Sequence, residues 1–389
     1  GPAGGEWGLG PMFMATNCAG CHLNAGRGRA LDPSGLRVFQ QLVRLSIPGE
    51  GPHGGPKPDP NYGNDIQSFD MITRKDPEAR AGEGEVFLDW VFSTFTFPDG
   101  TEIELRKPSV RIENLNFGPL ADGFMISLRN TQALLGMGYL EAIPEKDILK
   151  NAERQKALGL NGRPNYVWDD FKKKTVMGRF GWKANQPSIK QQIAAAFLAD
   201  IGITSEIYPE QNCTPVQKEC LEALKGSKPE LRPDLFEPIT FWSQSLDVPA
   251  QRNRDTPAFK QGEKLFETAG CAACHVPEMR TGKYPAVPQI GNKLIRPYTD
   301  LLLHDMGPDL ADGRPDFKAS GSDWRTPPLW GLGLSAQVNA STSFLHDGRA
   351  RNLLEAIVWH GGEAKSARDK FVAFTKAQRE DLLFFLNGI

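Results

Sequence analysis

Two short motifs hold the residues with the most specific chemistry in this chain. Each reads Cys-x-x-Cys-His: CAGCH covers residues 18–22 and CAACH covers residues 271–275. A zinc ribbon places its cysteine pairs close together, and a thioredoxin-like dithiol needs no adjacent histidine. In a c-type cytochrome the two thiols form thioethers to the porphyrin, and the histidine binds the iron. The motifs therefore predict two covalently bound haem c groups, held by Cys18, Cys21, His22, Cys271, Cys274 and His275.

A comparison of the two halves indicates which iron is open. The segment Trp182–Ala196 can be laid over the segment His346–His360 at a constant offset of 164 residues, since 346 − 182 = 164. Apolar residues recur at helical spacing in both segments, which predicts an amphipathic helix in each half. His360 then aligns with Ala196. We expect His360 to close the second axial site of the C-terminal iron, while the N-terminal iron stays open to peroxide or oxygen.

The same helix of the N-terminal half carries polar groups that could serve an open iron. Peroxide cleavage needs a group that moves a proton between the two oxygens, and Gln192 and Asp200 are candidates. Gln191 is interpreted as a solvated helix residue. Trp182 is a candidate for carrying electrons between the irons, and ordinary core packing is its alternative role.

Longer stretches resemble one protein family. They are GLGPMFMATNCAGCHLNAGRGR, DWRTPPLWGLGL and SFLHDGRARNLLEAIVWHGGEA. With the two haem motifs, they make the chain similar to the di-haem oxidoreductase family of peroxidases, some of which are called thiol oxidoreductases. This family is related to the bacterial di-haem cytochrome c peroxidases and to the MauG-like enzymes. The resemblance covers nearly the whole chain and is most specific over residues 325–364.

The resemblance implies a ligand for the C-terminal iron. In the relatives, that ligand follows the histidine of the HDG motif by fourteen residues, and here 360 − 346 = 14, so His360 occupies the ligand position. The peroxidases commonly carry Met there and the MauG-like enzymes Tyr. A bis-histidine haem is therefore implied, with a lower potential than a His/Met haem.

The resemblance also implies roles near the N-terminal haem. The relatives have a Trp between the haems and a Gln ten residues later, which Trp182 and Gln192 match. The catalytic Glu of the family aligns with Asp200 only if two residues are deleted. Arg325 stands where the family has a basic residue close to the haem. The relatives often hold calcium between their domains, but Ser341 and Ser343 here replace the usual Thr and Pro.

The other histidines have less specific surroundings. His53 lies in a Gly/Pro-rich stretch. Some di-haem peroxidases keep a loop histidine on the reactive iron until reduction releases it, and His53 could act in this way or could simply face solvent. We expect His304, Met306 and His346 to contact the haem or its surroundings without binding iron.

The elements that would position these groups are expected to form a mainly α fold. We predict two cytochrome-c-like haem domains with long loops, covering residues 1–245 and 246–389. The Pro-rich stretch 228–257 is typical of a linker between them. Residues 85–115 alternate apolar and polar side chains around Pro-Asp-Gly, which predicts a small β-hairpin insertion in the N-terminal half.

Two further features concern the end of the chain and its cysteines. Residues 374–389 have the pattern of an amphipathic helix, with Thr375 and Gln378 as a capping box. Cys213 and Cys220 lie outside the haem motifs. They could form a disulfide, as expected in the oxidising compartment where haem c is attached, or remain two inert thiols.

Composition limits the partners. The formal net charge is −2 and the sequence pI is about 6.4, which favours neither nucleic acid nor an anionic membrane. No apolar run long enough for a transmembrane helix is present. The chain begins GPAGGEWGLG, without Met or a hydrophobic leader, and we read it as the mature or trimmed form of an exported periplasmic protein.

These observations predict an enzyme that reduces hydrogen peroxide at the N-terminal haem, or uses it to oxidise a partner. The C-terminal haem would relay electrons from a small electron-donor protein or from a protein substrate. Two alternatives stay open. One is an electron-transfer cytochrome with both irons closed, and the other is an oxygenase like the rubber-cleaving di-haem enzymes.

Overall fold

Strands contribute far more to the molecule than the sequence indicated. The computed structural model describes residues 8–31, 41–70, 82–223, 226–339 and 343–389. Helices make up 32% of the structure and strands 20%, so the prediction of a mainly α, cytochrome-c-like fold was wrong. The physical reason is that most strands have two to five residues, too few to show an alternating pattern, and some of them, such as β1 with β4 and β2 with β7, pair across long stretches of chain.

The strands form several small antiparallel sheets, with β2 central in the order β3-β2-β7. β2 and β7 pair from Leu42 opposite Arg129 to Ser46 opposite Met125. The strands are β1 (Met12–Phe13), β2 (Leu42–Glu50), β3 (Pro56–Lys57), β4 (Phe69–Asp70), β5 (Glu85–Thr96), β6 (Glu102–Glu113), β7 (Met125–Arg129), β8 (Tyr166–Asp169), β9 (Lys174–Met177), β10 (Met279–Arg280), β11 (Leu294–Ile295), β12 (Leu303–Asp305) and β13 (Asp323–Arg325).

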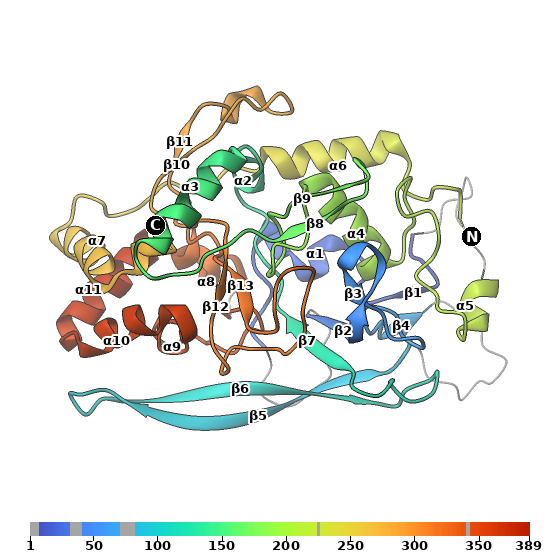
Figure 1. Ribbon diagram of the computed structural model, residues 1–389, viewed down its shortest axis with the longest axis horizontal. Coiled ribbons are helices and arrows are strands. Elements are labelled where there is room, and N and C mark those ends of the chain that lie inside the picture. Colours follow the sequence, from blue (N-terminus) through green and yellow to red (C-terminus); the bar gives the residue numbers. More distant parts are fainter. Residues whose placement is uncertain (1–7, 32–40, 71–81, 224–225, 340–342) are drawn as a thin grey trace.

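The helices lie above the β5–β6 hairpin in Figure 1, and α7, α9, α10 and α11 gather at one end of the molecule. They are α1 (Cys18–Cys21), α2 (Met137–Glu141), α3 (Glu145–Lys156), α4 (Ile189–Ile201), α5 (Lys218–Glu222), α6 (Pro233–Ser245), α7 (Pro257–Ala269), α8 (Ser335–Asn339), α9 (Leu353–Val358), α10 (Lys365–Ala373) and α11 (Lys376–Gly388). The capping box of Thr375 and Gln378 at α11 is confirmed.

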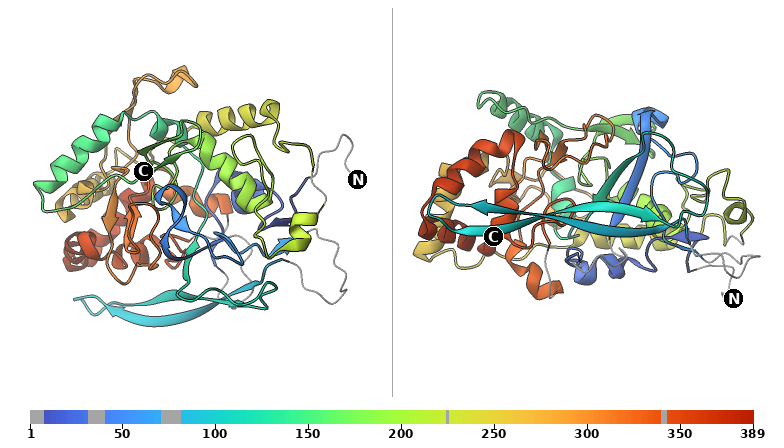
Figure 2. Two further views of the ribbon diagram at one scale, coloured as in Figure 1. Left: turned by 45° about the vertical axis from the view of Figure 1, so that its right-hand side comes forward. Right: turned by 90° about the horizontal axis from the view of Figure 1, so that it is seen from below.

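The predicted hairpin is present, and it is long. β5 and β6 pair over twelve residues each, and Gly100 closes the turn with φ of 82°. Figures 1 and 2 show the hairpin running along the molecule beneath both halves. Val86 and Leu88 near its base join a core of N-terminal residues, whereas Phe97 and Leu105 near its tip join the core of the C-terminal helices. The hairpin therefore connects the two halves.

The stretch proposed as a linker contains a helix. α6 begins at Pro233, where a missing N–H costs nothing because the first helical N–H groups have no intrahelical partner. Phe236 is 1% exposed and packs with Leu231 and Ala194. A high proline content indicated a linker, but burial of this apolar face stabilises a helix that contains Pro238 as well.

The two helices predicted from the overlay both form, at equivalent positions. Ser188 caps α4 by accepting from Gln191 N at 3.2 Å, and Asn352 caps α9 by accepting from Glu355 N at 2.9 Å. The caps keep the same offset, since 352 − 188 = 164. α9 ends at Val358, two residues before His360, and two glycines follow that disfavour continuation of the helix.

Candidate functional site

Two cavities lie side by side in the centre of the molecule. The first has a volume of about 560 Å³ and is lined by the CAGCH residues, and the second, of about 420 Å³, is lined by the CAACH cysteines and histidine. Both volumes fall in the range typical of cofactor sites. The cavities share a wall made by Arg27, Trp182, Arg325 and Pro327.

The cysteine pairs have the surroundings of haem anchors and not of thiolate sites. Because each pair lines its own cavity, the four cysteines cannot form one zinc ribbon. Burial raises the pKa of Cys21 to about 11 and that of Cys271 to about 12. Both thiols are therefore protonated at neutral pH, unlike the thiolates of redox dithiols.

His22 is held at the first cavity by the short helix α1. Asn17 caps this helix by accepting from Gly20 N at 2.9 Å, and His22 N donates to Cys18 O at 2.8 Å. Burial lowers the pKa of His22 to about 4, so its ring is neutral at pH 7. The Nδ1 atom of His22 is buried and has no hydrogen-bond partner. A neutral, buried imidazole is the form that binds a metal.

One face of α4 lines the first cavity. Gln192, Ala196 and Asp200 are spaced four residues apart, and all three lie on this wall. Asp200 Oδ1 is buried and has no hydrogen-bond partner. Gln191 points elsewhere: it accepts from Asp170 N at 2.8 Å and donates to Trp168 O at 3.1 Å, so it is buried and structural instead of solvated.

The surroundings of Asp200 make its carboxyl group weakly acidic. Its pKa is raised to about 7, chiefly by burial; Arg44 opposes this shift and Asp65 adds to it. Arg44 donates to Asp65 Oδ2 at 2.8 Å, which leaves no direct ion pair between Arg44 and Asp200 in the structure. A carboxyl group that titrates near pH 7 can both accept and return a proton.

Two arginines of this cavity were not identified from the sequence. Arg44 on β2 and Arg129 on β7 both line it, and Arg129 donates to Asp316 Oδ2 at 3.0 Å. Arg129 heads the stretch RNTQALLGMGY, which resembles the stretch headed by Arg325, so this internal repeat was a usable signal. No sequence pattern pointed to Arg44, because strand β2 reaches the cavity only through its pairing with β7.

In the second cavity, His275 and His360 each have one ring nitrogen hydrogen-bonded to a backbone carbonyl, as is usual for histidines that bind a metal. His275 Nδ1 lies 2.9 Å from Tyr298 O, and His360 Nδ1 lies 2.7 Å from Ala356 O. A carbonyl partner fixes the proton on Nδ1, which leaves Nε2 with a free lone pair. Burial lowers the pKa of both rings, and that of His275 to about 4. Both histidines line this cavity, as a bis-histidine haem requires.

His304 lies beside the second haem motif in a cluster of opposite charges. Its Nε2 is 2.8 Å from Asp300 Oδ2, its Nδ1 is 3.0 Å from Glu363 Oε2, and Cys274 Sγ is 3.7 Å away. Burial opposes its protonation, but these hydrogen bonds raise the pKa of His304 to about 12. Cys274, Asp300 and His304 are the one group of three potential metal ligands found among the described residues. With the ring protonated, His304 has no lone pair for iron.

His346 and Met306 lie at the same cavity and pack against aromatic side chains. The ring of His346 stacks on Trp324 with centroids 3.6 Å apart and planes 11° apart. Met306 packs against the apolar cluster of Trp182, Leu310 and Trp324. Both line the second cavity, so they can contact a group bound there.

The shared wall is rigidly held. Trp182 is 6% exposed, and its Nε1 donates to Asn130 O at 2.7 Å. Arg325 N donates to Trp182 O at 2.8 Å, and Arg325 Nε donates to Gly181 O at 2.9 Å. Burial lowers the pKa of Arg325 to about 10, which leaves it cationic at neutral pH.

Some sequence candidates lie away from the cavities. His53 stacks on Trp168 with centroids 3.8 Å apart and is not among the residues that line the first cavity. Ser343 accepts from Asn130 Nδ2 at 2.8 Å, and Ser341 lies outside the described residues, so calcium binding stays a prediction. The Cys213–Cys220 disulfide is confirmed.

Comparison with known proteins decides the family. The family model described as "Di-haem oxidoreductase, putative peroxidase" matches residues 2–389. The chain belongs to this family. No curated protein matches it. Among solved structures, hydrazine synthase of Kuenenia stuttgartiensis, pressurised with xenon, is 17% identical over 68% of this chain and 73% of its own, with a TM-score of 0.32.

Membership of the di-haem oxidoreductase family makes haem the expected occupant of both cavities, and the residues fit that group. Each cavity has a neutral histidine next to a pair of unpaired cysteines. Within the described part of the chain, no helix is long and apolar enough to cross a membrane.

Proposed function

We propose that the protein is a periplasmic di-haem c enzyme that reduces hydrogen peroxide, or uses it to oxidise a partner. The N-terminal unit, residues 1–245, would carry the reactive haem on Cys18, Cys21 and His22. The C-terminal unit, residues 246–389, would carry an electron-transfer haem on Cys271, Cys274 and His275, with His360 as second ligand. The observation that carries this proposal is that Ala196 and His360, which align in the sequence overlay, each line one of the two cavities.

The residues around the first cavity support proton transfer to peroxide. When bound, haem supplies the iron that binds peroxide and the electrons that reduce it. Asp200 would take a proton from the inner oxygen and return it to the outer one, for which a pKa of about 7 is well suited. Gln192, one turn of α4 from Ala196, would orient the peroxide by hydrogen bonding. Arg44 and Arg129 provide positive charge where negative charge develops.

The shared wall supports electron transfer between the two sites. Trp182 and Arg325 line both cavities, which supports an aromatic path for electrons between two bound haems. Electrons would enter from a small donor protein, or from the protein substrate itself, and pass through Trp182 to the N-terminal site. Each peroxide takes up two electrons and two protons and yields two waters.

An electron-transfer cytochrome is the second candidate, and Met137 favours it. Met137 lines the first cavity, and a Met thioether is a common axial ligand of haem c. If Met137 bound the N-terminal iron, both irons would be closed.

The test is the EPR spectrum of the fully oxidised holoprotein without additives. One high-spin and one low-spin ferric signal are expected, because His360 would close only the C-terminal iron. Two low-spin signals in the wild type, with one turned high-spin by Met137→Ala, would establish the electron-transfer alternative and overturn the proposal. Peroxide consumption by the reduced protein is the second measurement, and its absence would equally count against the enzyme.

A further inference from the structure

Three tryptophans lie together around the wall between the cavities. Trp182 and Trp324 are both buried with Leu310 in one apolar cluster, and Trp359 packs against it. Trp182 and Trp324 line the second cavity. Indole rings so close to an oxidising centre are all potential electron donors, yet only Trp182 also lines the first cavity. Their surroundings differ in a way that affects how easily each ring loses an electron.

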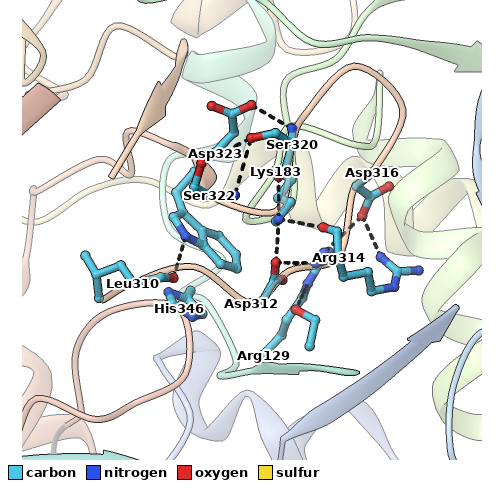
Figure 3. Close-up of polar contacts among 12 residues, drawn as sticks. Arg129, Lys183, Leu310, Asp312, Arg314, Asp316, Ser320, Ser322, Asp323 and His346 are labelled. Atoms are coloured by element: carbon cyan, nitrogen blue, oxygen red, sulfur yellow. Dashed lines mark hydrogen bonds and ion pairs between the residues drawn. The ribbon is translucent and has the colours of Figure 1, made fainter. Parts of the chain in front are cut away.

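Trp324 carries a buried cation on its ring. Lys183 Nζ lies 4.4 Å from the centre of the Trp324 ring, and the Lys183 side chain is 0% exposed. Its ammonium donates to Asp312 Oδ1 at 2.7 Å, to Arg314 O at 2.7 Å and to Ser320 O at 2.8 Å (Figure 3). These three acceptors use all three donors of an ammonium group and fix it in place.

Lys183 is positively charged at neutral pH, whereas the imidazole ring of His346, which stacks on Trp324, is neutral. Burial lowers the pKa of Lys183 to about 8, which leaves it protonated at neutral pH. His346 stacks on the same indole, and burial lowers its pKa to about 4, so it is neutral.

Trp359 carries a second buried cation. The guanidinium carbon of Arg349 lies 4.5 Å from the ring centre of Trp359, and the Arg349 side chain is 2% exposed. Arg349 is held by Asp347, with Nη2–Oδ2 at 2.7 Å, and by the carbonyl of Asp309 at 2.7 Å. In both pairs a carboxylate anchors the cation and offsets part of its charge, but the cation is the group that lies over the ring.

Trp182 is set apart by what surrounds it. Among the described residues, no lysine or arginine lies over its ring. Its Nε1–H donates to the carbonyl of Asn130 at 2.7 Å, and the Nε1–H of Trp324 likewise donates to the carbonyl of Leu310 at 2.9 Å, so this bond does not distinguish the two rings. A cation on the face of an indole is attracted by the neutral ring and repelled by the ring once it has lost an electron. Because both buried indoles donate to a carbonyl, the cation over the ring is the difference between Trp324 and Trp182.

We propose that Lys183 and Arg349 confine oxidation to Trp182 by making Trp324 and Trp359 harder to oxidise. The inference rests on the proposed peroxide reduction. Trp182 would give one electron to the N-terminal site, where peroxide takes up two electrons and two protons to form two waters. The other electron would come from the C-terminal site. The donor protein would then reduce the C-terminal site again, and this site would pass a second electron to the oxidised indole, so that the donor supplies both electrons of the cycle. Lys183 and Arg349 act through the tryptophans and are positioning residues, not catalytic ones.

The test maps where tryptophan is oxidised in the holoprotein. Wild type is treated in one arm with substoichiometric hydrogen peroxide, and in a second arm with a photochemically generated one-electron oxidant that needs no peroxide. Hydroxylated tryptophan is then quantified in each peptide by mass spectrometry. Trp182 and Trp324 are each 6% exposed, so solvent access does not distinguish them. Oxidation of Trp182 is expected to exceed that of Trp324 and of Trp359 by about tenfold.

Variants of Lys183 and Arg349 separate the effect of the positive charge from the effect of side-chain packing. Lys183→Met should raise oxidation of Trp324 about tenfold without affecting Trp359, and Arg349→Met should do the reverse, as expected for loss of a desolvated cation–π contact. Lys183→Arg should keep the wild-type pattern. Arg111→Met is the matched control, because Arg111 lies over Phe87 on the hairpin and its side chain is 44% exposed.

The outcomes distinguish this inference from the proposed function. Peroxide that is not consumed would contradict the proposed function, while the photochemical arm would still test the order of oxidation. Equal oxidation of Trp182 and Trp324 in the wild type would overturn the inference, even if the variants failed to fold. Unchanged oxidation of Trp324 in a folded Lys183→Met protein would overturn it as well.

Discussion

At the scale of single residues, the two halves differ at one critical position. Ala196 and His360 are equivalent in the internal repeat, and each lines its own cavity. The methyl side chain of Ala196 cannot bind iron. The imidazole of His360 is neutral and its Nδ1–H donates to a carbonyl, so its Nε2 atom can bind iron. Under the proposed function, this single difference separates a reactive site from an electron-transfer site.

Replacing His360 with Ala should therefore open the C-terminal iron. We expect one low-spin ferric EPR signal of the holoprotein to become high-spin, because the second axial ligand is lost. His53→Ala is the matched control, since His53 stacks on Trp168 away from the first cavity. A spectrum of the His360→Ala protein identical to that of wild type would exclude His360 as a ligand.

Replacing Asp200 with Asn should slow peroxide turnover by about 10² to 10⁴, the usual contribution of general acid–base catalysis. The EPR spectrum should be retained. Because the pKa of Asp200 is raised to about 7, the carboxylate that accepts the peroxide proton forms only as pH rises through that value. Wild-type kcat/KM should therefore increase with pH between about 6 and 8.

In the Asp200→Asn protein this pH dependence should disappear. Exposed Asp122→Asn serves as the control and should keep the wild-type profile. An unchanged profile in Asp200→Asn would assign the proton transfer to another group.

At the scale of elements, the β5–β6 hairpin stabilises the contact between the halves. Its tip carries Phe97, which is 2% exposed and packs among the C-terminal helices. Arg379 of α11 donates to Asp99 in the turn, and Arg106 of β6 donates to Arg349 O at 3.2 Å. Arg349 is the cation over Trp359, so the hairpin also supports the tryptophan cluster.

Truncating Phe97 should reveal this role. Phe97→Ala should lower the free energy of unfolding by about 3–5 kcal/mol, through lost burial and the cavity left behind. Phe92 lies on the same hairpin and is 54% exposed, so Phe92→Ala should change stability by less than about 0.5 kcal/mol. Chemical denaturation followed by circular dichroism measures both. Equal effects of the two variants would show that the hairpin tip is not buried in solution.

At the scale of the whole molecule, the two halves share both a wall and a core. Arg27, Trp182 and Arg325 line both cavities. One hydrophobic core combines Phe97 and Leu105 of the N-terminal half with Phe259 and Phe385 of the C-terminal half. Each half alone would expose part of this apolar surface to water.

The holoprotein should therefore unfold in one cooperative transition. Haem absorbance and far-ultraviolet circular dichroism should give coincident denaturation curves, because neither half keeps its core when the other unfolds. Two resolved transitions would show that residues 1–245 and 246–389 fold independently.

The sequence by itself determined the chemistry and the local elements. The CxxCH spacing, the hairpin signal around Pro98-Asp99-Gly100 and the capping box of α11 all depend on residues near one another in the chain, and the match of Ala196 with His360 comes from aligning two such local patterns. Short-range patterns of this kind do not require knowledge of the fold.

The tertiary structure alone decided what distant segments do together. The pairing of β1 with β4 and of β2 with β7, Arg44 at the first cavity and Lys183 over Trp324 depend on contacts between segments far apart in sequence. Such contacts form only when burial of apolar surface brings the segments together, so no local pattern records them. For the same reason the prediction of a mainly α fold failed. The cysteines and histidines expected to hold haem line two cavities, and their role as haem ligands stays a prediction.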